Sequence, residues 1–84
     1  MLVVLLFAAQ LANWDQHISL GQYYLDHADP GRAATEFESA TSLKPDSAAA
    51  HYNLGVALRL WGDPQGAEGS LRRARGSKKT IRPQ

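Results

Sequence analysis

The sequence predicts an all-α protein, in which antiparallel helix–turn–helix hairpins stack as a short α-solenoid behind an apolar N-terminal helix. Sliding the chain against itself by 34 residues aligns similar residues in two copies, and Asp29-Pro30 falls on Asp63-Pro64. A helix–turn–helix period of this length is typical of helical repeats. On both sides of each Asp-Pro pair, apolar residues recur every three or four positions, which indicates helices with one buried face.

Size and composition limit the classes of protein to which this chain can belong. At 84 residues, of which 44% are hydrophobic, the chain has room for one small globular domain. It has no cysteine, which excludes a disulfide framework, a thiolate metal site and a catalytic thiol. The net charge is +1, but the charges are unevenly distributed along the chain. Residues 72–84 carry six basic and no acidic side chains, whereas residues 1–71 carry three basic and eight acidic ones.

The apolar segment at residues 1–12 has two interpretations, which we weigh equally. Its run is shorter than the roughly 20 apolar residues that span a bilayer. It is similar to the apolar region of a secretory signal, but no Lys or Arg precedes it, and Phe7 and Gln10 stand where cleavage needs small residues. The segment is therefore either a helix packed on the first hairpin or an export-signal remnant, and localisation stays open between cytoplasm and export to the periplasm.

The first hairpin is predicted over residues 13–46. Asn13, followed three residues later by a glutamine, approximates a capping box, so we expect a helix from Asn13 to Ala28. Asp29 is expected to cap the second helix, because a proline at the first helical position needs no N–H partner. This second helix is expected to end near Leu43.

The second hairpin, over residues 47–76, repeats this order. Its helices are expected from Ser47 to about Leu60 and from Pro64 to about Arg75. Two glycines in the last helix each cost roughly 1 kcal/mol relative to alanine, so this helix should be the least stable. We expect an apolar side of it to remain uncovered.

Residues 77–84 show no apolar periodicity, and we expect a flexible basic segment there. Because at least three repeats are generally needed to bury a continuous core, two hairpins should be marginally stable alone. The chain is therefore expected to self-associate or to form part of a longer array.

The repeated residues resemble the tetratricopeptide repeat family, whose pattern is W-x2-L-G-x2-Y followed by a small residue, an aromatic residue, a small residue and a proline. The matching residues are Leu20, Gly21, Tyr24, Ala33, Phe37, Ala40 and Pro45 in the first copy, and Leu54, Gly55, Ala67, Leu71 and Ala74 in the second. The second copy has Leu58 for the tyrosine and Lys79 for the closing proline. His17 and His51 stand where the family often has tryptophan. The resemblance covers residues 14 to about 76, and packing accounts for almost all of its motif residues.

No motif for catalysis, phosphate binding or dinucleotide binding is present, so we predict no enzyme activity, no catalytic residues and no cofactor. The histidines His17, His27 and His51, with Asp26 and Asp29 near the second of them, could suggest a metal cluster. Packing and solvation explain these histidines better, so we predict no metal site.

The resemblance implies a protein-interaction scaffold that binds a protein or peptide along a groove lined by the first helix of each hairpin. The residues expected to face the ligand are Gln22, Leu25, Asp26, Tyr52, Asn53, Val56 and Arg59. Some family members grip a C-terminal carboxylate, but Ile18 and Gln22 stand where lysine and asparagine would be needed.

Other functions remain as alternatives. The chain could be a regulatory or substrate-presenting part of a larger enzyme, such as a glycosyltransferase or a peptidase, or an envelope assembly protein. We expect no nucleic acid partner, because the aromatic residues lie in the acidic part of the chain and the run of basic residues lies outside it.

Overall fold

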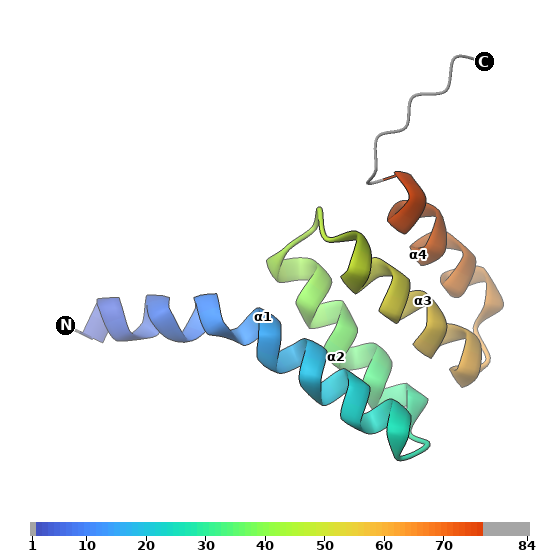
Figure 1. Ribbon diagram of the computed structural model, residues 1–84, viewed down its shortest axis with the longest axis horizontal. Coiled ribbons are helices and arrows are strands. Elements are labelled where there is room, and N and C mark those ends of the chain that lie inside the picture. Colours follow the sequence, from blue (N-terminus) through green and yellow to red (C-terminus); the bar gives the residue numbers. More distant parts are fainter. Residues whose placement is uncertain (1, 77–84) are drawn as a thin grey trace.

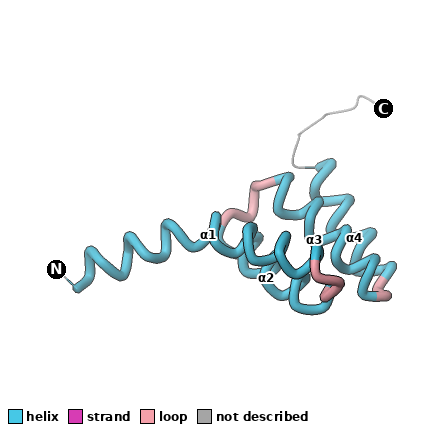
Figure 2. The backbone as a smooth tube through the Cα atoms, turned by 60° about the horizontal axis from the view of Figure 1, so that its bottom comes forward, coloured by secondary structure: helices cyan, strands magenta, loops and turns pink. Residues whose placement is uncertain are grey.

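The computed structural model describes the backbone of residues 2–76 and the side chains of residues 14–76. This part of the chain forms four α-helices: α1 (Leu2–Asp26), α2 (Pro30–Leu43), α3 (Ala48–Trp61) and α4 (Pro64–Gly76). Each helix packs against the next one along the chain, so that two hairpins stand side by side (Figure 1). Short turns join them (Figure 2). The prediction of an all-α protein with hairpins in sequence is confirmed.

Helix α1 is continuous, and the predicted helix start at Asn13 is wrong. The reason is local: residues 2–26 contain no proline, and their one glycine lies well after Asn13, so nothing interrupts the backbone hydrogen bonds. In Figure 1 the N-terminal part of α1 extends away from the other helices. The side chains of residues 1–12, on which the packing and export interpretations depend, lie outside the described ones, as does the basic segment at residues 77–84.

The helix starts follow from capping side chains, as the sequence predicted for α2. Asp29 Oδ1 accepts a hydrogen bond from the Arg32 backbone N–H at 3.2 Å, and proline occupies the first helical position. In the second hairpin Ser47 Oγ accepts from the N–H of Ala50 at 3.1 Å, and Asp63 Oδ1 accepts from the N–H of Gly66 at 3.0 Å. Each oxygen satisfies a donor that the helix itself leaves unpaired.

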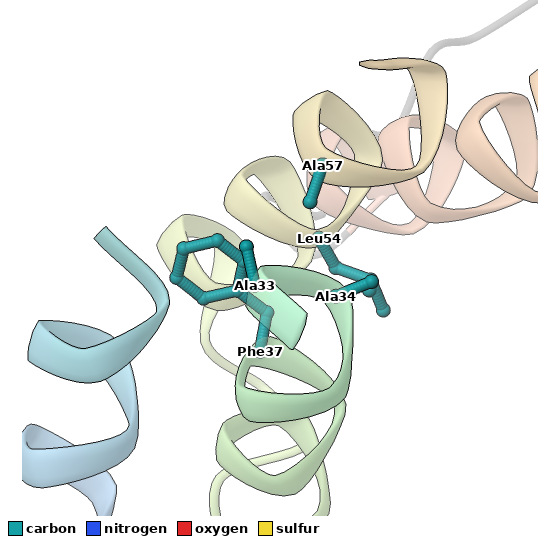
Figure 3. Packing of buried hydrophobic residues seen from close by; sticks show 5 residues of the cluster. All are labelled: Ala33, Ala34, Phe37, Leu54 and Ala57. Atoms are coloured by element: carbon teal, nitrogen blue, oxygen red, sulfur yellow. The ribbon is translucent and has the colours of Figure 1, made fainter. Parts of the chain in front are cut away.

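The core lies where α1, α2 and α3 meet, and Phe37 is its largest fully buried side chain (Figure 3). Phe37 can lie close to α1 because Gly21 has no side chain: a Cβ there would overlap the phenyl ring. The second hairpin repeats this arrangement, since a Cβ at Gly55 would lie 2.7 Å from Leu71 Cγ. The glycines of the repeat therefore set how closely the two helices of each hairpin approach.

The inward face of α2 consists of Ala33, Ala34, Phe37 and Ala40, all buried, whereas Thr41 is half-buried. The prediction that α4 leaves an apolar side uncovered is wrong. Two of its apolar residues, Ala67 and Ala74, are buried, and the third, Leu71, is half-buried. The solvent side of α4 is polar instead, with Arg72 Nη2 3.4 Å from Glu68 Oε2 across one turn.

Candidate functional site

Helix α3 has one face in the core and another in solvent. Leu54 and Ala57 are buried against α2. On the other side Tyr52, Val56 and Arg59 recur at spacings of four and three residues, which places them along one stripe. Tyr52 is 56% exposed and Arg59 is exposed, while Val56 is half-buried. Asn53, next to this stripe, is also half-buried.

Helix α1 carries the other three residues that the sequence predicts to face a ligand. Gln22 and Asp26 are exposed. Leu25 is half-buried and packs against the core cluster, so part of its surface is used for packing. Gln22 and Val56 occupy equivalent positions one repeat apart, which means that each hairpin offers the same helix face.

The seven residues lie on two helices, α1 and α3, which both pack against α2 (Figure 1). Two hollows on the described surface are lined by other residues. One, of about 630 Å³, lies beside the last turns of α2 and α4. The other, of about 470 Å³, lies between the first half of α2 and the C-terminal end of α3. The seven residues thus form two accessible helix faces, and neither hollow includes them.

Sequence reasoning missed two exposed residues, Leu60 and Trp61, whose exposed fractions are 63% and 62%. They are the last two residues before Gly62, where α3 ends. The available signal was their size: two large apolar residues stand at the end of a helix, at positions that the repeat pattern does not use for packing. Trp61 also lines the hollow between α2 and α3.

The three histidines have separate partners. His17 Nδ1 lies 2.6 Å from Glu36 Oε1, across the α1–α2 contact. The buried His51 donates from Nε2 to the backbone carbonyl of Pro45 at 2.8 Å, and His27 donates from Nδ1 to the carbonyl of Tyr23. In the described part of the chain, no three His, Asp or Glu side chains are grouped to hold a metal ion. The histidines are therefore structural in this arrangement, and they do not form a shared site.

Consecutive hairpins with a 34-residue period, small residues at the helix contacts and the same capped Asp-Pro turn in both copies define a helical-repeat protein. The tetratricopeptide repeat family model matches residues 18–80, and the chain belongs to that family. Comparisons with curated proteins and with solved structures gave no match. Tetratricopeptide repeats are generally protein-interaction modules. Within residues that the structure describes, no helix has both the length and the hydropathy needed to cross a membrane.

Proposed function

We propose that this chain is a non-catalytic interaction scaffold, which binds a peptide or partner protein through the solvent faces of α1 and α3. The supporting observation is the division of α3. Its residues Leu54 and Ala57 are buried, whereas Tyr52, on the opposite side of the helix from Leu54, is 56% exposed. A large aromatic ring left in solvent next to a well-packed face is available for a partner.

The chemistry of the face suits a polypeptide ligand. Tyr52 offers a rigid ring with apolar area and a hydroxyl group, and Asn53 offers an amide that can pair with a peptide backbone. Arg59 can bind a carboxylate with two parallel hydrogen bonds. On α1, Gln22 and Asp26 add an amide and a carboxylate. This mixture favours an extended segment with polar groups of both signs.

Two features argue against narrower functions. A clamp for a C-terminal carboxylate needs paired basic and amide groups, but Ile18 is apolar and packs against the core cluster. Nucleic acid binding needs stacking rings beside cations. The exposed rings Tyr23, Tyr52 and Trp61 lie on α1 and α3, whereas the basic run begins at Arg72 on α4.

Site-specific photo-crosslinking tests the proposal. A photoreactive benzoylphenylalanine is placed at Tyr52, and in a matched variant at Gln65, which is exposed on α4. In a lysate of the source cells, Tyr52 should give a discrete crosslinked protein that Gln65 does not give. Adding Arg59→Ala to the Tyr52 variant should reduce this product, while circular dichroism confirms that the helices are retained. Equal products from both positions would contradict the proposal.

A further inference from the structure

The hollow of about 470 Å³ between α2 and α3, hereafter the Trp61 groove, contains an exposed indole. Trp61 lies at the end of α3, and its ring packs over Gly31 of α2, where a Cβ would come within 3.0 Å of Trp61 Cζ3. Most of the Trp61 side chain nevertheless remains in solvent. Because the groove is lined by α2 and the end of α3, it is distinct from the Tyr52 face of the proposed function.

Three carboxylates line the same groove as this indole. Asp29, Glu38 and Asp63 line the groove, and Arg32 is the one basic residue in its lining. Asp29 and Asp63 meet here because each caps the helix after its Asp-Pro turn, and the two turns are one repeat apart. Arg32 Nε lies 3.7 Å from Asp29 Oδ2, so its charge offsets that of Asp29. Glu38 and Asp63 then give the groove a net negative charge.

An exposed indole beside carboxylates is the chemistry that binds a lysine or arginine side chain, through the ring face and through charge-assisted hydrogen bonds. The chain has one concentrated source of such groups. Residues 72–84 carry six basic side chains and no acidic one, and they begin on the last turns of α4. The acidic groove and the basic run therefore complement each other in charge.

Within one molecule, the groove and the end of α4, after which the basic segment follows, lie at opposite ends of α3. Since α4 runs back along α3, Gly76 lies at the opposite end of α3 from Trp61 (Figure 1). The 14 residues of α3 span roughly 20 Å at 1.5 Å per residue. Lys79 follows Gly76 by three residues, which extend over at most about 10 Å. The backbone from Gly76 to Lys79 therefore covers only about half of the distance to Trp61 in the same chain, whereas the basic segment of a second copy can approach the groove directly.

We propose that the Trp61 groove binds the basic segment, residues 77–84, of a second copy of this chain. Each copy then presents an acidic groove at one end and a basic segment at the other, so the contact is head-to-tail and can continue from copy to copy. Lys78 or Lys79 occupies the groove against the indole, with Glu38 and Asp63 as the facing carboxylates. The contact is weak and salt-sensitive, because the facing carboxylates Glu38 and Asp63 are exposed to solvent.

Sedimentation velocity on the full chain tests this proposal. At about 0.05 M NaCl the weight-average mass should rise with protein concentration, and at about 0.5 M NaCl the chain should sediment as a monomer, because the Debye length shortens. Trp61→Ala and Glu38→Gln should each weaken the association about five-fold. The matched controls Tyr52→Ala and Glu68→Gln, an exposed aromatic residue and an exposed acid outside the groove, should leave it unchanged. Because Tyr52→Ala alters the face of the proposed function, the two proposals can fail separately.

A second measurement covers the case in which Trp61→Ala loses its fold. A fluorescein-labelled peptide of residues 77–84 is titrated with the full chain, and its anisotropy should rise. The same peptide with its Lys and Arg residues replaced by Gln should not bind, and Glu38→Gln should weaken binding where Glu68→Gln does not. A monomer at low salt and high concentration overturns the proposal. Equal binding of the labelled peptide by Glu38→Gln and Glu68→Gln also overturns it. The same holds if an unrelated lysine-rich peptide binds while the chain itself remains monomeric.

Discussion

Ala28 and Gly62 occupy equivalent positions one repeat apart, and both adopt a left-handed backbone, with φ of 59° and 104°. In each turn the N–H of the following residue donates to a carbonyl five residues earlier. Asp29 N–H donates to the Tyr24 carbonyl and Asp63 N–H to the Leu58 carbonyl, both at 2.8 Å. This is a Schellman ending, which favours glycine. The first turn forms it with alanine, so it contains strain that the second turn does not.

Replacing Ala28 by glycine should therefore stabilise the protein by about 0.5–1 kcal/mol, because the relief of left-handed strain exceeds the entropy that glycine adds to the unfolded chain. The reciprocal change Gly62→Ala should destabilise it by a similar amount. No atom lies within 4 Å of a Cβ at Gly62, so the effect would come from the backbone alone. Urea unfolding followed by circular dichroism measures both variants. A destabilised Ala28→Gly would contradict the assignment of strain to this turn.

Gly21→Ala should destabilise the protein by about 1–3 kcal/mol, because the added Cβ would overlap the buried Phe37 ring and force α1 away from α2. Gly69→Ala is the matched comparison, because a Cβ there meets nothing within 4 Å. Since alanine favours helix, Gly69→Ala should stabilise by up to about 1 kcal/mol. Thermal melts of the two variants should shift in opposite directions, and a shift in the same direction would contradict the packing seen at Gly21.

His51→Leu should cost about 1–3 kcal/mol, because the change leaves the Pro45 carbonyl without the hydrogen bond from His51 Nε2. The equivalent change His17→Leu should cost less, since both His17 and its partner Glu36 are partly exposed and water can replace the bond. Chemical denaturation at neutral pH compares the two. If His17→Leu were the more damaging change, the burial of the two sites would not explain their importance.

The isolated chain should be only marginally stable. Of the nine buried hydrophobic residues in the described part, seven are alanines, and only Phe37 and Leu54 are large. Small side chains remove little apolar area from water, so the core contributes little free energy. Calorimetry at high salt, where the head-to-tail contact should be absent, is expected to show a broad transition. A cooperative melt above about 65 °C from a monomer would contradict this expectation.

Much of the fold could be predicted from the sequence, because the repeat specifies local structure twice. Residue type and spacing predict the Asp29 cap, and the structure confirms it and shows the equivalent cap at Asp63. Tyr24 and Leu58, which differ in type but share a repeat position, both pack against the same core cluster. The seven predicted interaction residues are exposed or half-buried, but whether they bind a partner stays a prediction.

The sequence by itself determined the helices, their turns and the small residues at their contacts, because propensity, capping and a 34-residue period act over short stretches of chain. The tertiary structure alone decided what lies between distant stretches. It brought Trp61 onto Gly31, gathered Asp29 and Asp63 at one groove, and gave α4 a polar solvent face. These features depend on how one hairpin sits against the next, and that arrangement results from packing across the whole core, which no local pattern encodes.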